Sequence, residues 1–249
     1  MPTALVLVPH PDDEAYAFGG LLRLLADAGW RLRIHCASSG EGGERHDGGQ
    51  PGPAYLGPAR ELELSESCRL LGAHPPVPWR LPDGGLARLT GGGPGRVAAA
   101  LSDTNPDLLL TLGPDGAYGH PDHLALYSWV VEAWSQLPLD GRPPLLFAAF
   151  PRGLFLPQYE KCIDMMGNPP DPPPEAIGRD DFDLDLDIST VSDVKLAAIA
   201  AHRSQLPSGD PGALFPPGII QALLHRERYT AADSASRSRA HALLAELRT

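Results

Sequence analysis

Apolar runs and helical spacing alternate along the first part of the chain. Residues 3–8 form a continuous apolar run, which is typical of a strand buried on both faces. Leucines at helical spacing follow and stop at Gly29, a residue that commonly ends a helix. Residues 31–37 then predict a second strand. A strand, a helix and a strand in this order predict a parallel sheet with a right-handed crossover.

The middle of the chain continues this alternation with long irregular segments between the elements. Residues 40–57 and 73–94 are rich in Gly and Pro and show no period, so both are predicted to be loops. Proline suits the first turn of a helix, and Pro58 is therefore placed at the start of one. The predicted helices cover 58–71, 96–102 and 121–136, and the predicted strands cover 107–112 and 145–150.

The last third is predicted to elaborate the same domain. Residues 166–178 are dense in proline and predicted to be irregular. Over 181–188 aspartates alternate with apolar residues, which indicates a half-exposed strand at a sheet edge. Residues 191–202 and 231–247 have helical patterns. With neither an internal repeat nor a linker, we predict one α/β domain over residues 1–249: a Rossmann-like, mostly parallel sheet with helices on both faces.

Charge and composition narrow the classes of function. The chain has 20 Lys and Arg against 31 Asp and Glu, a formal net charge of −11. Nucleic acids and anionic membranes bind proteins through basic surface, so neither is a predicted partner. The 27 glycines and 28 prolines stay below the share of roughly 25–30% that signals disorder. A hydrophobic fraction of 43% can supply a core.

Cysteine usage and hydropathy indicate where the protein works. The three cysteines form no CxxC pair, so neither a thiolate zinc site nor a disulfide framework is indicated. The N-terminus lacks the charged and apolar stretches of a secretion signal. The longest apolar runs fall far short of the roughly 20 residues that cross a bilayer. We therefore expect a cytoplasmic protein with no membrane span.

Two short segments concentrate histidines and carboxylates. Residues 10–14, His-Pro-Asp-Asp-Glu, follow the first strand directly. Residues 119–123, Gly-His-Pro-Asp-His, come after the strand predicted at 107–112. In an open parallel sheet, ligands bind at the carboxyl ends of strands where the winding reverses. Both segments face one crevice if these two strands are neighbours at the reversal.

Imidazoles and carboxylates are ligands that zinc accepts in catalytic sites, which use three protein ligands and leave one position to water. His10 and Asp13, at a strand-to-helix corner, can converge on one ion with a histidine from the second segment. Such a site lowers the pKa of water from 15.7 to about 7. A free carboxylate can then accept a proton, and a histidine off the metal can assist the oxyanion or the leaving nitrogen. This reasoning does not choose between His120 and His123, or between Asp12 and Asp13.

Together the two motifs resemble the PIG-L/LmbE family. Its members are zinc-dependent deacetylases of N-acetylglucosamine conjugates, including enzymes of mycothiol and bacillithiol synthesis. Other segments are similar to family segments: the Gly-Glu loop at 39–43, the Arg-x-x-Glu at 60–63, the Asp-Gly at 83–84 and the Lys…His-x-Ser-Gln at 195–205. The resemblance implies removal of an N-acetyl group from a small amino-sugar conjugate by a metal-bound hydroxide. It also favours a homo-oligomer.

The resemblance assigns roles to residues at matching positions. It implies that His10, Asp13 and His123 bind one zinc ion and that Asp12 is the general base. Iron or manganese are alternatives for the ion, because N and O ligands do not strongly exclude them.

The same resemblance implies four further roles. His120 stabilises the oxyanion or acts as a general acid, and Tyr118 helps to polarise the acetyl carbonyl. Arg60 and Asp83 contact the sugar. The aglycone is not readable, since the loops at 40–57, 73–94 and 166–178 carry no recognisable code.

Other functions fit the sequence less well. No Gly-x-Gly-x-x-Gly follows the first strand, and the chain has no Walker A Gly-Lys pair, Gly-x-Ser-x-Gly or His-Glu-x-x-His. The aspartates at 181–187 lack the Gly and the distal Glu of an EF-hand loop. The alternative from another class is a catalytically silent metal- or sugar-binding module on the same fold.

Overall fold

The computed structural model describes residues 1–248 and contains a seven-stranded sheet in the order β3-β2-β1-β4-β5-β7-β6. Neighbours among the first five strands are parallel, while β7 runs antiparallel to both β5 and β6. The strands are β1 Thr3–Val8, β2 Arg31–Ser38, β3 Val77–Leu81, β4 Leu108–Leu112, β5 Leu145–Ala149, β6 Leu184–Asp187 and β7 Arg226–Ala231.

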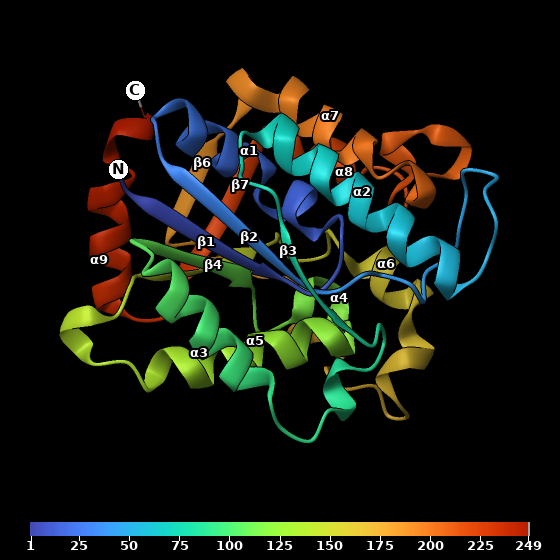
Figure 1. The fold of residues 1–249 in the computed structure, drawn as a ribbon, viewed down its shortest axis with the longest axis horizontal. Coiled ribbons are helices and arrows are strands. Elements are labelled where there is room, and N and C mark those ends of the chain that lie inside the picture. Colours follow the sequence, from blue (N-terminus) through green and yellow to red (C-terminus); the bar gives the residue numbers. More distant parts are fainter. Residues whose placement is uncertain (249) are drawn as a thin grey trace.

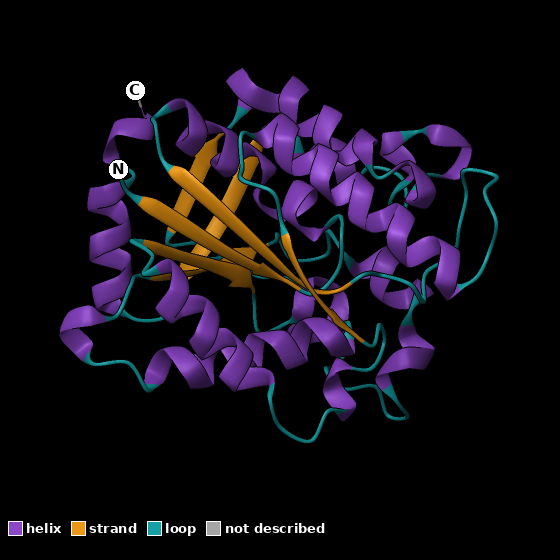
Figure 2. Cartoon of the chain, in the orientation of Figure 1, coloured by secondary structure: helices purple, strands orange, loops and turns teal. Residues whose placement is uncertain are grey.

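Helices cover both faces of this sheet, as Figures 1 and 2 show. One layer is formed by α1 Asp13–Asp27, α2 Pro53–Leu71 and α7 Ser192–Ala201, which contact one another. The other layer is formed by α3 Gly93–Thr104 and α5 Pro121–Ser135. The remaining α-helices are α4 Gly116–Gly119, α6 Leu156–Lys161, α8 Ile219–Leu223 and α9 Ser234–Leu243. The predicted α/β, Rossmann-like class is confirmed.

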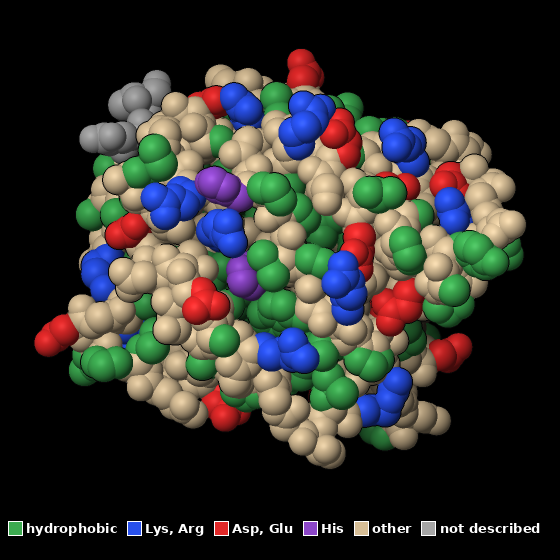
Figure 3. Space-filling view, viewed as in Figure 1, with side chains coloured by type: hydrophobic (Ala, Val, Ile, Leu, Met, Phe, Trp, Pro, Cys, Tyr) green, Lys and Arg blue, Asp and Glu red, His purple; other side chains and the backbone are tan. Residues whose placement is uncertain are grey.

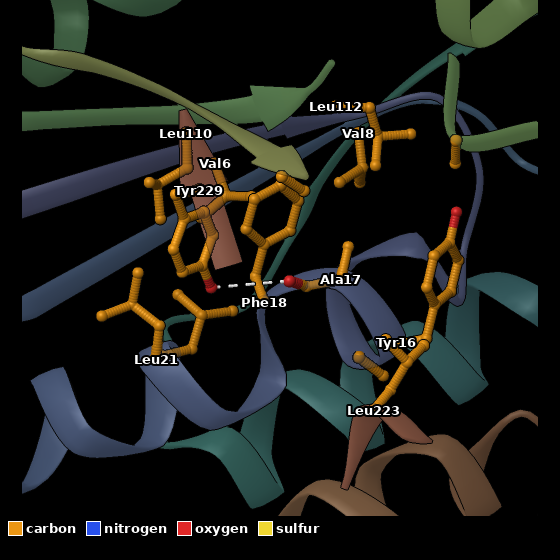
Figure 4. Packing of buried hydrophobic residues seen from close by; sticks show 14 of the residues in the cluster. Val6, Val8, Tyr16, Ala17, Phe18, Leu21, Leu110, Leu112, Leu223 and Tyr229 are labelled. Carbon is orange, nitrogen blue, oxygen red and sulfur yellow. Dashed lines mark hydrogen bonds between the residues drawn. The ribbon is translucent and has the colours of Figure 1, made fainter. Parts of the chain in front are cut away.

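The buried strand β1 shows why its apolar run is unbroken. Val6 and Val8 belong to the core cluster shared with α1 and α2, part of which is drawn in Figure 4. Leu5 and Leu7 point to the opposite side and join the cluster shared with α3 and α5. Since all four side chains are fully buried, alternation with polar residues would place polar groups in one of the two cores.

Several predicted boundaries were wrong, and the start of α2 is one of them. The helix begins at Pro53, within the predicted loop 40–57, and Pro58 lies inside it rather than at its first position. Gly52 accepts the first helical hydrogen bonds, from Tyr55 and Leu56. Two prolines suit the first turn, and the earlier one occupies it.

Two strands were missed in the sequence. The first, β3, lies in the segment predicted to be a loop, where Pro78 and partial exposure hide an edge strand. The second, β7, precedes the helix predicted from residue 231, which instead begins at Ser234. Glu227 of β7 is buried and pairs with the equally buried Lys195 at 2.7 Å. A charged residue on the inward face concealed the apolar alternation.

The acidic strand β6 lies at the sheet edge, as predicted. Leu184 and Leu186 are buried, whereas Asp185 and Asp187 are exposed. Over the face drawn in Figure 3, lysine and arginine side chains are interspersed with aspartate and glutamate, so neither sign dominates there. Within residues 1–248, no helix has the length and apolar composition required to cross a membrane.

The winding of the sheet reverses between β1 and β4. These strands are adjacent and parallel, with Ala4 opposite Leu108 and Val6 opposite Leu110. The predicted adjacency is therefore confirmed. Their carboxyl ends bring the segment after β1 and the segment after β4 to one edge of the sheet, where α/β folds place their ligands.

Candidate metal centre and active site

The corner after β1 orients the first pair of predicted ligands. His10 follows the strand, and its backbone N–H donates to Oδ2 of Asp13 at 2.9 Å. Asp13 is the first residue of α1, so this hydrogen bond turns its carboxylate back toward the strand end. The His10 Nδ1 atom lies 3.5 Å from Oδ2 of Asp13.

The segment after β4 brings in the second motif through a strained turn. Ala117 has φ 63° and ψ −52°, outside the helical region, and Asp115 stabilises the turn by accepting from the Ala117 N–H at 3.1 Å. His123 then lies in the first turns of α5 and is fully buried. Its Nδ1 lies 3.0 Å from the carbonyl of Gly116. Because a carbonyl only accepts, this ring nitrogen carries the proton.

The three predicted ligands, His10, Asp13 and His123, lie close together. The Nε2 of His123 lies 3.2 Å from Nδ1 of His10 and 3.5 Å from Oδ1 of Asp13. The other nitrogen of His10 faces Oδ1 of Asp83 at 3.1 Å, which favours a proton there. When both rings are neutral, their two lone pairs therefore point at each other beside a carboxylate.

This donor set fits a divalent cation. Ligands about 2.0–2.1 Å from a tetrahedral zinc stand about 3.3 Å apart. The two imidazole nitrogens are 3.2 Å apart, and each lies 3.5 Å from one of the two Asp13 oxygens, Oδ2 for His10 and Oδ1 for His123. In the described chain, Asp13 and Asp122 have only imidazoles as ion-pair partners. A cation between two lone pairs and a carboxylate would remove the repulsion among them.

A second triplet, His10, His120 and His123, has one ligand atom from each residue within 4.8 Å of the others. Its chemistry argues against His120 as a ligand. The backbone N–H of Asp122 donates to Nδ1 of His120 at 3.1 Å, so the neutral ring carries its proton on Nε2. No lone pair then remains for a metal, and Nε2 is a hydrogen-bond donor.

The third triplet, His10, Asp83 and Asp122, surrounds the far nitrogen of His10. The fully buried carboxylate of Asp122 accepts from the backbone N–H groups of Gly84 and Leu86 at 2.8 and 2.9 Å. Its Oδ2 lies 3.4 Å from Nε2 of His10. These two carboxylates therefore lie against Nε2 of His10, the ring nitrogen that does not face His123, and can orient the ring as partners of metal-bound histidines commonly do.

The protonation of the three histidines follows from their surroundings. Burial lowers the pKa of His123 to about 4 and, together with the neighbouring His123, that of His120 to about 2. Both rings are therefore neutral. Burial alone would lower the pKa of His10, but Asp122, Asp13 and Asp83 outweigh it and raise the pKa well above its usual value. The same carboxylates favour any positive charge at this point.

Asp12 lies beside the cluster rather than within it. Its backbone has φ 114°, a region that side chains rarely adopt, and its Oδ2 accepts from Nη2 of Arg60 at 2.9 Å. Arg60 also donates to the carbonyls of Gly40 and Pro11. Burial raises the pKa of Asp12 to about 7, although Arg60 opposes the shift.

The other predicted site residues lie around this cluster. The ring of Tyr118 is 5.3 Å from that of His123 and 5.9 Å from that of His120. Asp83 accepts from the Gly42 N–H at 2.8 Å. Arg60 is almost fully buried, and the hydrogen bonds that the structure gives it are to the protein itself.

A buried group behind Asp12 was missed as part of the site. Glu14 accepts from the backbone N–H of Asp12 at 3.0 Å and from Ser67 at 2.6 Å, and its Oε1 lies 2.7 Å from Nε2 of His202. These contacts fix the backbone that carries Asp12. The late His-x-Ser-Gln segment could have indicated His202, but nothing local connects it with Glu14, 188 residues away.

Comparison with known proteins gives a consistent result. Residues 5–134 match the family described as PIG-L, GlcNAc-PI de-N-acetylase. A probable N-acetyl-alpha-D-glucosaminyl L-malate deacetylase 2 from Bacillus cereus is 30% identical over 210 residues, covering 81% of this chain and 82% of that protein. A 1D-myo-inositol 2-acetamido-2-deoxy-alpha-D-glucopyranoside deacetylase from Rhodococcus jostii is 27% identical, covering 94% and 93%.

The fold is shared more widely. The 4-carboxy-2-hydroxymuconate hydratase GalB from Pseudomonas putida KT2440 superposes with a TM-score of 0.64 at 23% identity, covering 94% of this chain and 97% of that one. At this identity the likeness shows the fold alone. Because the family match spans more than half of the chain, and the Bacillus cereus relative is matched over most of its length, the chain belongs to the PIG-L family of GlcNAc-PI de-N-acetylases.

Proposed function

We propose that this protein hydrolyses the N-acetyl group of an N-acetylglucosamine conjugate at a metal centre held by His10, Asp13 and His123. The observation that carries the proposal is the convergence of two imidazole nitrogens, 3.2 Å apart, beside the Asp13 carboxylate. The names of the Bacillus and Rhodococcus relatives, both deacetylases of glucosamine conjugates, support the reaction.

The residues around the centre have roles that their contacts support. Zinc, when bound, supplies a Lewis acid that lowers the pKa of water to about 7. Asp12, held by Arg60 at 2.9 Å, takes the proton from the attacking water. His120 presents Nε2–H to the developing oxyanion or to the leaving nitrogen. Tyr118, next to both histidines of the second motif, helps to polarise the acetyl carbonyl.

Several finer points belong to the same proposal. Zinc is the proposed ion, with ferrous iron or manganese as alternatives. Asp83 and Arg60 are proposed to contact the sugar. A cytoplasmic setting is supported by the three free cysteines, of which Cys36 and Cys68 are buried. A homo-oligomer stays a prediction from the family resemblance.

Removing the His120 imidazole should slow chemistry and leave the metal in place. The variant His120→Ser retains an oxygen that can cap α5, so helix stability changes little. We expect kcat to fall by about 10²–10³-fold, as for a lost oxyanion donor. Zinc content should stay at that of the wild type when both proteins are measured by elemental analysis. Loss of zinc from this variant would instead identify His120 as a ligand.

Acetate release tests the reaction itself. N-Acetylglucosamine linked to malate, the same sugar linked to inositol, and free N-acetylglucosamine are offered to protein that has been stripped of metal and then reloaded with zinc. We expect acetate from at least one conjugate, only after reloading, and none from the matching conjugates that carry a free amine. A protein that binds the conjugates and zinc but releases no acetate would be the silent binding module, and the proposed reaction would be wrong.

A further inference from the structure

Tyr16 is the third residue after Asp13 in α1 and is almost completely buried. Residues three apart lie on one face of a helix, and the Tyr16 hydroxyl donates to Oδ1 of Asp13 at 2.8 Å. No sequence motif indicated this contact, and the proposed reaction gives Tyr16 no role.

The hydrogen bond completes the support of the Asp13 carboxylate. Its Oδ2 already accepts the backbone N–H of His10 at 2.9 Å, so each oxygen has one protein donor. Two donors on opposite oxygens fix the plane of the carboxylate as well as its position. The oxygen held by Tyr16 is also the one that lies 3.5 Å from Nε2 of His123.

The ring of Tyr16 is in turn held by aromatic neighbours. It meets Phe215 edge-on at a centroid distance of 4.9 Å, and Phe155 and Phe150 lie at 6.1 and 6.2 Å. Figure 4 shows the ring of Tyr16 apart from those of Phe18 and Tyr229, and its hydroxyl reaches Asp13 at the start of the same helix. Phe150, Phe155 and Phe215 all follow β5 in the sequence, so the later part of the chain orients a side chain of the first helix.

We propose that Tyr16 is a positioning residue that holds Asp13 in its ligating orientation and thereby sets the affinity of the centre for zinc. The inference rests on the proposed metal site. Hydrogen-bond partners of metal ligands typically account for about 10–100-fold in metal affinity, because the ligand is then ordered before the ion arrives. Tyr16 acts through Asp13 and is not expected to touch the substrate.

The test is a zinc titration of stripped protein against a chromophoric chelator, which needs no turnover. In Tyr16→Phe the ring packing is kept and only the hydroxyl is lost. We expect its dissociation constant for zinc to rise by about 10–100-fold. The matched control is Tyr159→Phe, since Tyr159 is fully buried and its hydroxyl donates to the Pro172 carbonyl at 3.0 Å. The control should bind zinc as the wild type does.

The outcomes separate this inference from the proposed function. If the wild type binds no zinc, the proposed metal centre is wrong, and this inference is wrong with it. If the wild type binds zinc and Tyr16→Phe differs from Tyr159→Phe by much less than tenfold, only the role of Tyr16 is refuted. Phe215→Leu keeps the hydroxyl but removes its closest aromatic support. This variant should also raise the dissociation constant for zinc. If Tyr16→Phe does not fold, the zinc affinity of Phe215→Leu tests the role of Tyr16 in its place.

Discussion

Replacing His123 by alanine is expected to remove the metal and, with it, turnover. His123 is the only residue of the second motif whose free nitrogen faces both His10 and Asp13, because its other nitrogen donates to Gly116. Loss of a ligand should weaken zinc binding by more than the roughly 10–100-fold caused by loss of a supporting partner. Acidifying water from pKa 15.7 to about 7 corresponds to about 12 kcal/mol, so deacetylation should fall to background.

The measurement is zinc content by elemental analysis after dialysis, together with the thermal midpoint of the stripped proteins. His35→Ala is the control, because His35 is also buried but lies on β2 and accepts from the Trp79 indole at 3.3 Å. It should retain one zinc. Stoichiometric zinc in His123→Ala would show that the ligand assignment is wrong and would favour the triplet of His10, Asp83 and Asp122, which does not contain His123.

The position of the site could be predicted because it depends on local motifs and one topological rule. His10 and Asp13 are placed by a corner of four residues, and the corner is held by a hydrogen bond between those two residues. The adjacency of β1 and β4 follows from the winding of a parallel sheet. Neither step requires knowledge of distant contacts.

The division of roles between the two histidines could not be predicted from residue types. It depends on which ring nitrogen carries a proton, and that depends on a backbone carbonyl at Gly116 for His123 and a backbone N–H at Asp122 for His120. Only the strained turn at Ala117 places that carbonyl under His123. At the sequence level, the choice therefore rested on the family resemblance alone.

Polar contacts between residues far apart in the chain could likewise not be predicted from the sequence. Glu14 is adjacent to a motif residue, yet its partners Ser67 and His202 are 53 and 188 residues away. The strand β7 was missed for the same reason, since Glu227 is acceptable inside the core because Lys195 pairs with it and the backbone N–H groups of Gly20 and Leu21 donate to it. A buried charged residue interrupts the apolar pattern of its strand, and the sequence alone does not show that a distant residue pairs with it.

Replacing Asp12 by asparagine is expected to slow turnover by about 10²–10⁴-fold with zinc still bound. Asparagine is the most specific substitution here, because it changes the fewest other properties of the site. It tolerates the positive φ of 114° better than alanine does, and its side-chain oxygen can still accept a hydrogen bond from Arg60. What it loses is the capacity to take a proton from water. The effect should therefore appear in kcat, with zinc content and the thermal midpoint close to those of the wild type.

Asp185→Asn supplies the matched control, because this exposed carboxylate of β6 pairs with Arg226 and Arg228 at the far edge of the sheet. It should leave kcat unchanged. If Asp12→Asn lost zinc as His123→Ala is expected to do, Asp12 would be a ligand and the base would have to be sought among the remaining carboxylates. If it kept both zinc and full activity, no proton would pass through this corner. The two neighbouring carboxylates can be tested independently because different partners hold them. Arg60 and Glu14 hold Asp12, whereas the His10 N–H and the Tyr16 hydroxyl hold Asp13.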